Sequence, residues 1–337
     1  MLRMKPQVLL AYEALIRNIS QGYMGKEEIL ASYYKYRSGF TGEQNLDYKL
    51  NLLPSYYEQI SDIRLKGMKQ TRFQMDKILL TSKVIIVLES KYIRGEILYQ
   101  KDTRQLVQIF DGKTKAYKDP VLQAFTQRKN LKHWLALHGY HVPIVALAVS
   151  TNDEAFLKHD SENDELSNCF VTLEEVIYRV EKIYQSFSND VLSTVDIKKI
   201  AHLLKKENDP LLINVLDQHH IRTSELEFGI RCTICNRKMS RTYGTWRCSY
   251  CEINDKEAHI QKLYDYFLLI GDTMNNEQCR VWLQLGREKM WLVSRILKNS
   301  PFEATGKTKL RKYHRPAFDQ FPQNASVDLW KRASVSR

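Results

Sequence analysis

The order of hydrophobic and polar positions predicts a helical start, a group of strands, a long helix and a further strand. Apolar residues recur at helical spacing over much of 7–36, a break is expected at 38–42, and a second helical run is expected from Glu43 to about Tyr57. Four runs rich in β-branched and aromatic residues then predict strands. They are RFQMDKILL (72–80), VIIVLESK (84–91), EILYQ (96–100) and LVQIF (106–110).

The first 150 residues close with a helix and a buried strand. Asp119 followed by Pro120 is a favoured helix start, and the helical pattern continues to about His138. The run PIVALAVS, residues 143–150, is apolar enough to be covered on both faces. Together these elements predict an α/β domain whose mixed central sheet is flanked by helices on both sides.

The chain changes character after residue 151. An acidic stretch is followed by helical patterns, one of which opens with the capping box Thr172–Glu175. Further along, four clustered cysteines precede more helical patterns and a basic, polar end. We therefore expect an N-terminal helical segment (1–36), the α/β domain (37–151), an acidic linker and helical region (152–228), a small cysteine module with its following helices (229–305), and a basic tail (306–337).

The distribution of charge bears on possible partners. Residues 1–150 hold 23 Lys and Arg against 13 Asp and Glu, residues 151–228 hold 8 against 16, and residues 229–337 hold 20 against 10. Basic regions attract nucleic acid, although a solvated basic surface explains net charge equally well. The N-terminus has no signal-peptide pattern, and no apolar run approaches the ~20 residues that span a bilayer. We therefore expect a cytoplasmic protein without a membrane segment.

Two CxxC pairs give the most specific local signal. Cys232-Thr-Ile-Cys235 and Cys248-Ser-Tyr-Cys251 are separated by twelve residues. Four thiolates at this spacing predict the closed tetrahedral shell of a structural Zn²⁺ site, with a short β-hairpin between the pairs. Five basic residues crowd this segment and are candidates for nucleic-acid contacts, or equally for a solvated rim. They are Arg231, Arg237, Lys238, Arg241 and Arg247.

A second candidate site lies at the end of the strand 84–91. Glu89 and Lys91 are two residues apart and share one face of the strand, and Asp76 lies on the preceding strand across a short turn. Two carboxylates suit Mg²⁺ or Mn²⁺, and a lysine beside them can orient a water or offset charge during phosphodiester hydrolysis. The spacing alone is common, and a surface ion pair at a strand end also explains it.

Several motifs together resemble the nuclease-related domain (NERD) proteins of Gram-positive bacteria, which belong to the restriction-endonuclease-like, PD-(D/E)xK, fold group. The resemblance rests on Gly42-Glu43, FQMD (73–76), VLESK (87–91), and Asp119-Pro120 with Gln123 and Gln127. It continues at 229–251 and 258–271, which resemble the zinc-binding part of such proteins.

The resemblance implies a restriction-endonuclease-like fold and a metal-dependent nuclease, with DNA as the favoured substrate. By position, Asp76 and Glu89 would bind Mg²⁺ or Mn²⁺ and Lys91 would be the catalytic lysine. Glu43 would be an accessory acid, and Gln123 would contact the site or the substrate backbone, although a plain helix-surface position explains this glutamine equally well. Three positions depart from the family pattern, namely Lys77, Ser90 and Tyr92.

Two other functions stay open. One is a nucleic-acid-binding protein that keeps the fold without turnover, and the other is a protein-interaction factor that uses the zinc module. The sequence does not distinguish DNA from RNA, and it gives no oligomeric state.

Overall fold

The computed structural model describes residues 3–20, 22–100, 105–159, 167–325 and 327. The chain divides into two compact units, Met1–Arg3 with Ser38–Leu211 and Met4–Arg37 with Leu212–Arg337. Part of the expected acidic stretch (160–166) and the end of the expected basic tail (328–337) lie outside the described residues. Helix α2 (Lys26–Leu50) contributes residues to both units.

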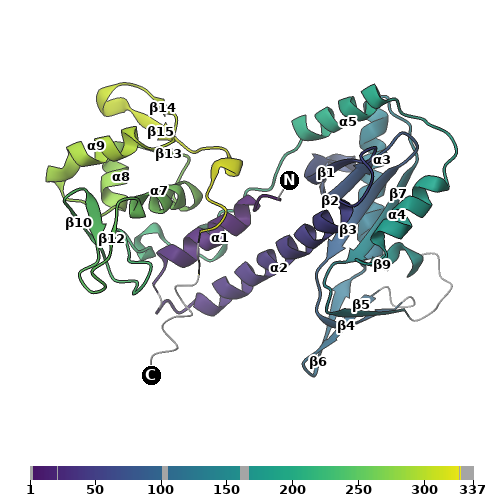
Figure 1. Ribbon diagram of the computed structural model, residues 1–337, viewed down its shortest axis with the longest axis horizontal. Coiled ribbons are helices and arrows are strands. Elements are labelled where there is room, and N and C mark those ends of the chain that lie inside the picture. Colours follow the sequence, from purple (N-terminus) through teal and green to yellow (C-terminus); the bar gives the residue numbers. More distant parts are fainter. Residues whose placement is uncertain (1–2, 21, 101–104, 160–166, 326, 328–337) are drawn as a thin grey trace. The chain divides into compact units, whose positions relative to one another are not determined.

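A five-stranded mixed sheet of order β1-β2-β3-β7-β9 forms the centre of the first unit (Figure 1). The β1–β2 and β2–β3 pairs are antiparallel, whereas β3–β7 and β7–β9 are parallel. Its strands are β1 (Glu58–Lys66), β2 (Arg72–Leu80), β3 (Ile85–Lys91), β7 (Ile144–Ser150) and β9 (Phe170–Thr172). A four-stranded sheet of order β6-β5-β4-β8 comprises β4 (Gly95–Gln100), β5 (Gln105–Phe110), β6 (Lys113–Lys118) and β8 (Ala155–His159).

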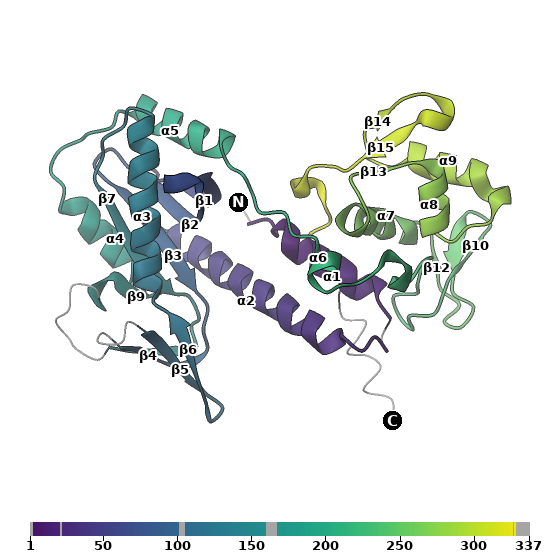
Figure 2. The same ribbon diagram turned by 180° about the vertical axis from the view of Figure 1, so that it is seen from behind.

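Helices cover both faces of the five-stranded sheet (Figures 1 and 2). Helices α3 (Pro120–Leu137) and α5 (Thr194–Lys206) pack on one face, and α2 and α4 (Val176–Gln185) pack on the other. The alternation of β3 explains this arrangement, because Ile85 and Val87 join the core under α3 whereas Ile86 and Leu88 join the core under α2. The predicted α/β fold, with a mixed sheet flanked by helices, is confirmed.

Helix α2 departs from the prediction. The sequence predicted a break at 38–42 and a second helix to about Tyr57, but the helix runs without interruption to Leu50. Phe40, Leu46 and Leu50 are buried. Their packing offsets the ~1 kcal/mol that each glycine costs in a helix interior.

Four strands of the first unit were not predicted, and the short β9, which pairs in parallel with β7, is one of them. Strand β1 precedes the first expected strand, and β8 replaces part of an expected loop by pairing in parallel with β4. Strand β6, KTKAYK, shows no hydrophobic alternation because it is an exposed strand at the edge of its sheet, and among the described residues it pairs with β5 alone. Hydrophobic periodicity does not detect a strand of this kind.

The second unit contains helix α1 (Gln7–Asn18), which contacts α6 (Val215–Gln218) and α7 (Ala258–Leu269). The apolar spacing predicted a helix in this segment, and residues 8–16 of α1 are all buried, polar Glu13 included. The other elements of this unit are β10 (Ser240–Thr242), β11 (Thr245–Arg247), β12 (Asn254–Asp255), β13 (Thr273–Met274), α8 (Asn276–Trp282), α9 (Met290–Lys298), β14 (Ala304–Thr305) and β15 (Lys312–His314). Within the described residues, every helix is too short or too polar to cross a membrane.

Candidate active site and metal centre

The β2–β3 ladder stops at the candidate site. Lys77 pairs with Leu88, and no further pair joins the two strands toward the end of β3 among the described residues. Asp76 is the next residue on β2, and its Oδ2 accepts the backbone N–H of Ser90 at 2.9 Å. A side chain thus replaces a ladder carbonyl, which fixes the Asp76 carboxylate at the end of the sheet beside Glu89.

Glu89 and Lys91 project from the same face of β3, toward α3. Glu89 is 2% exposed, its Oε2 accepts a hydrogen bond from Gln127 at 2.5 Å, and its Oε1 accepts one from the Lys91 ammonium. Lys91 also donates to Oε1 of Gln123 at 3.0 Å. Because Gln123 and Gln127 are one helical turn apart on α3, a single face of this helix holds both members of the Glu89–Lys91 pair.

Glu43 comes from α2. Its Oε2 lies 2.8 Å from the guanidinium of Arg3, which also pairs with Asp47 at 3.1 Å. Arg3 further donates to the backbone carbonyl of Asp76 at 3.3 Å. One arginine therefore connects the acidic face of α2 with the strand that bears Asp76.

Gly42 sets the approach of α2 to the strand ends. A Cβ at this position would lie 2.5 Å from Oγ1 of Thr151 and 2.7 Å from Cβ of Tyr92. Ser90, on the opposite face of β3 from Glu89, is hydrogen-bonded to Thr151 at 3.0 Å. Only a glycine fits against Thr151, Tyr92 and Ser90. Gly42 therefore allows α2 to approach the strand ends closely, which places the adjacent Glu43 near the site.

The three carboxylates of this site repel one another. Burial raises the pKa of Asp76 well above its ordinary value, and the charges of Glu89 and Glu43 raise it further, against the opposing effects of the Ser90 N–H and Lys91. Burial also raises the pKa of Glu43 to about 7, although the nearby Arg3 lowers it. An added cation would relieve this repulsion.

The donor set fits a hard divalent cation. Asp76 and Glu89 offer carboxylate oxygens, the ligand type preferred by Mg²⁺, and each ionised carboxylate keeps lone pairs beyond those used in its hydrogen bonds. Gln127 Oε1 is buried beside Glu89 and has no hydrogen-bond partner in the described structure. It is a free acceptor for a water molecule at this end of the sheet.

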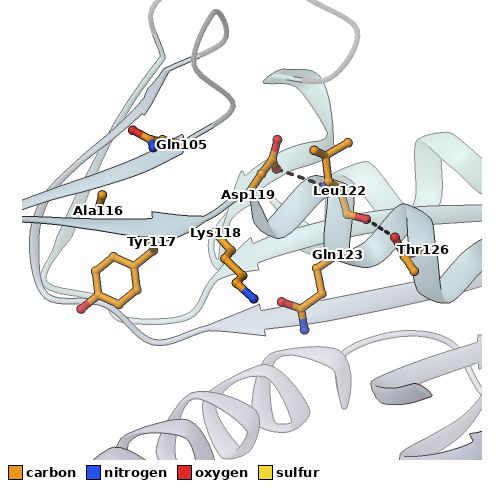
Figure 3. Close-up of a pocket in the computed structure, with 8 residues that line it drawn as sticks. All are labelled: Gln105, Ala116, Tyr117, Lys118, Asp119, Leu122, Gln123 and Thr126. Carbon is orange, nitrogen blue, oxygen red and sulfur yellow. Dashed lines mark hydrogen bonds between the residues drawn. The ribbon is translucent and has the colours of Figure 1, made fainter. Parts of the chain in front are cut away.

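A cavity of about 760 Å³ opens next to Gln123, between the end of β6 and the start of α3 (Figure 3). Asp119 caps α3 by accepting the N–H groups of Val121 at 2.8 Å and Leu122 at 3.1 Å, as its position before Pro120 predicted. Lys118 and Gln123 extend in the same direction from this wall (Figure 3). The cavity is therefore lined both by the exposed Lys118 and by Gln123, whose side-chain amide accepts a hydrogen bond from Lys91.

The four cysteines of the second unit converge. Their sulfur atoms all lie within 4.8 Å of one another, and those of Cys235 and Cys248 are 3.5 Å apart. A tetrahedron with metal–sulfur bonds of about 2.3 Å has edges of roughly 3.8 Å, so the cluster can hold a metal ion such as zinc. The N–H of Cys251 lowers the pKa of the Cys248 thiol to about 7, which favours the thiolate form that binds metals.

The predicted hairpin lies between the two cysteine pairs. Strand β10 pairs with β11, and the two residues of the turn, Tyr243 and Gly244, have φ of 46° and 81°. Both values suit the tight turns that match strand twist. Trp246 is 1% exposed and donates through Nε1 to Nδ1 of His259 at 3.2 Å, which packs the hairpin on helix α7. Burial lowers the pKa of His259 to about 4, so its ring stays neutral at physiological pH.

The five basic residues of this module differ in their surroundings. Arg231 pairs with Glu227 at 2.7 Å, and Arg241 donates to the backbone carbonyl of Lys256 at 3.3 Å. Three others are exposed, namely Arg237, Lys238 and Arg247. Arg237 lies over the ring of Tyr250, 3.7 Å from its centre.

The first unit is therefore an α/β domain in which acidic side chains gather at the ends of two neighbouring strands. Residues 38–151, about a third of the chain, match the family model described as nuclease-related domain, or NERD. The match covers all five candidate residues of the strand-end site, Glu43, Asp76, Glu89, Lys91 and Gln123, and supports a nuclease-related function in general terms. No curated protein matches the chain, and no solved structure does so either.

Three further residues belong to the surroundings of the site. Arg3 contacts Glu43 but lies 40 positions earlier in the chain, and no periodic signal connects them. Lys118 lies on the edge strand that the hydrophobic pattern does not show. Gln127 is the one of the three that the sequence indicates, since it lies four residues after Gln123 and both amides therefore share one helix face.

Proposed function

We propose that the first unit is a Mg²⁺- or Mn²⁺-dependent nuclease of the restriction-endonuclease-like fold group, with DNA as the favoured substrate. The observation that carries the proposal is the meeting of Asp76, Glu89 and Lys91 at one strand end, within a region that matches a nuclease-related domain. Metal-dependent phosphodiester hydrolysis uses this combination of hard oxygen ligands and a nearby cation.

In this proposal Asp76 and Glu89 hold the metal ion, whose chemistry is to polarise the scissile phosphate and to acidify a water. Glu89 is kept in place by Gln127 and Lys91, so its carboxylate needs little rearrangement. Lys91 is held between Glu89 and Gln123, where its ammonium group orients the attacking water and offsets charge that develops on the phosphate. Glu43 acts as an accessory acid whose place depends on Arg3.

The remaining basic groups serve substrate binding in this proposal. Lys118 lines the cavity next to Gln123 and contacts a phosphate that flanks the cleaved bond. In the second unit, the cysteine cluster binds structural zinc, and the exposed Arg237, Lys238 and Arg247 contact nucleic acid. Arg231 and Arg241 help through the contacts that hold the module together.

The test is cleavage of labelled DNA and RNA, single- and double-stranded, with Mg²⁺, Mn²⁺ or no divalent cation. We expect cleavage only with a divalent cation, and a loss of 100-fold or more, on the order seen when one charge-stabilising group is removed, in Asp76→Asn and Lys91→Met. Glu96→Gln is the matched control, because Glu96 is an acidic strand residue that pairs with Lys158 on the surface.

The alternatives give different results. Salt-sensitive binding without cleavage of any substrate would replace the nuclease with a nucleic-acid-binding protein, since phosphate contacts make affinity fall steeply with salt. Absence of both cleavage and binding would favour the protein-interaction factor. Cleavage that persists unchanged in Asp76→Asn would show that the active site lies elsewhere.

A further inference from the structure

A second cavity, of about 670 Å³, lies on the outer face of helix α9 in the second unit. The inner face of this helix is apolar and buried, and consists of Leu292, Val293, Ile296 and Leu297. The outer face carries Met290 and Trp291, which are 51% and 64% exposed. Met290 and Trp291 are adjacent, and exposed apolar groups that adjoin one another inside a polar rim are typical of interaction sites.

The cavity is bordered by positive charge. Arg295 and Lys298 follow Trp291 on α9, and Arg311 lies just before β15, whose Tyr313 also lines the cavity. The Arg295 guanidinium lies 5.5 Å from the centre of the Trp291 ring. Over residues 289–315 the sequence has eight Lys and Arg and a single acidic residue, Glu303.

Among the described residues, these cations have no acidic partner. Arg295, Lys298 and Arg311 form no ion pair with a carboxylate of the described residues. Arg295 instead lies near another cation, since burial and then the charge of Arg295 lower the pKa of Arg241. Positive charge therefore continues from α9 to the hairpin of the cysteine module, and an anionic ligand would complement it.

We propose that the cavity on the outer face of α9, called the α9 groove below, binds single-stranded nucleic acid. One base would stack on Trp291, and the adjacent phosphates would contact Arg295, Lys298 and Arg311. An exposed indole provides the flat apolar surface that an unpaired base needs, and arginine and lysine contact the backbone. Duplex DNA does not suit the groove, because its bases are already stacked. The class of ligand rests on the proposed function, but the groove includes neither the carboxylate site nor the cysteine cluster.

The test measures binding of fluorescein-labelled oligo-dT and oligo-rU by anisotropy, with the full chain carrying Asp76→Asn and without added divalent cations. This background prevents cleavage, so binding is measured whether or not the first unit is a nuclease. We expect Trp291→Ala to weaken binding roughly tenfold, the scale of one stacked base, and Trp291→Phe to retain most of the affinity. The two oligonucleotides show whether the groove prefers DNA or RNA.

Tyr178→Ala is the matched control. Tyr178 lies on α4 of the first unit, is 63% exposed and has Lys182 5.9 Å from its ring centre, so it reproduces an exposed aromatic beside a cation. Lys298→Gln and Arg311→Gln should each reduce the slope of log K against log salt by about 0.7, the value for one phosphate of a single strand. Thermal unfolding verifies that each variant remains folded.

Three results would overturn the inference. One is equal affinity of Trp291→Ala and wild type, and another is an equal loss in Trp291→Ala and Tyr178→Ala. The third is equally Trp291-dependent binding of a labelled polyglutamate peptide, which would assign the groove to an acidic protein segment. Failure of the nuclease proposal gives a different signature, namely Trp291-dependent binding in a protein that cleaves no substrate with Mg²⁺ or Mn²⁺.

Discussion

The carboxylate of Asp76 accepts the backbone N–H of Ser90 at 2.9 Å, at the point where the β2–β3 ladder stops. This hydrogen bond fixes a charged group where burial and two other carboxylates raise its pKa. Such an arrangement costs folding stability, as is common where residues are placed for function.

Asp76→Asn should therefore separate stability from activity. The amide oxygen can still accept the Ser90 N–H, but the repulsion with Glu89 and Glu43 is gone. We expect the free energy of unfolding in urea, without divalent cations, to rise by about 1 kcal/mol, while cleavage is lost. Glu96→Gln should change neither quantity. A lower stability of Asp76→Asn would mean that the carboxylate is needed to hold the strand ends together.

Two glycines of α2 should respond in opposite ways. A Cβ at Gly42 would meet Thr151 at 2.5 Å, whereas a Cβ at Gly39 would meet nothing within 4 Å. Gly42→Ala should lower the free energy of unfolding by about 1–3 kcal/mol through overpacking, and should reduce cleavage because Glu43 is displaced.

Gly39→Ala serves as the comparison on the same helix. It should raise the stability by up to about 1 kcal/mol, since alanine is the better helix former. Thermal unfolding of both variants measures the difference. Equal effects at the two positions would contradict the close approach at Gly42.

Metal analysis should find one zinc ion bound to each chain. Cys248→Ser should abolish zinc binding, and hydrogen exchange should then show loss of protection over 229–256, because four ligands fix a segment with little core of its own. Cys279→Ala is the control, since Cys279 is buried outside the cluster. Retention of full zinc content in Cys248→Ser would argue against a four-cysteine site.

The contact between α3 and α5 should depend on pH. The backbone carbonyl of Trp134 raises the pKa of His138, burial opposes this effect, and Glu207, 2.9 Å away, adds to it. Burial raises the pKa of Glu207, but hydrogen bonds from Trp134 and His138 outweigh burial and lower it. The stabilisation from His138 is complete below pH 6.5 and is lost as the pH rises through the raised pKa. The stabilisation from Glu207 is complete above pH 4.5 and is lost as the pH falls through the lowered pKa.

The pair should therefore contribute most between pH 4.5 and pH 6.5. Because both side chains are partly exposed, the contribution should be about 0.5 kcal/mol. Urea unfolding of wild type and His138→Gln at several pH values measures it. The difference should shrink as the pH rises above 6.5 and through the raised pKa of His138, and His133→Gln, which removes an exposed histidine of the same helix, is the control variant.

Lys118 should affect substrate binding more than turnover. Lys118→Ala should raise KM with little change in kcat, and should reduce the dependence of binding on log salt by about one phosphate contact. Lys113→Ala removes the same charge from the other end of β6 and should have a smaller effect. An unchanged KM in Lys118→Ala would exclude the cavity beside Gln123 from substrate binding.

Local signals explain which parts of the site could be predicted. The gathering of the four sulfurs followed from CxxC spacing, because a tight turn fixes residues three apart. The shared face of Glu89 and Lys91 followed from the period of a strand, and the start of α3 followed from Asp119 and Pro120.

Contacts between distant segments could not be predicted in this way. The pairing of Arg3 with Glu43 depends on tertiary packing, which leaves no mark at either position. Helix α2 continues through Gly39 and Gly42 because Phe40, Leu46 and Leu50 of the same helix are buried in the core. The free energy gained by this burial exceeds the cost of two glycines in a helix. Strand β6 has too few apolar residues to show a period.

The two faces of β3 give the carboxylate site an uncommon sensitivity. Gln127 reaches Glu89 from α3 on one side of the sheet, whereas Glu43 belongs to α2, whose Gly42 is seated against the strand ends on the other side. The distances between Asp76, Glu89 and Glu43 consequently depend on how three layers pack together, namely helix α3, the five-stranded sheet and helix α2. Heat or mild denaturant that lets one layer slide should inactivate the protein while its sheet is still intact.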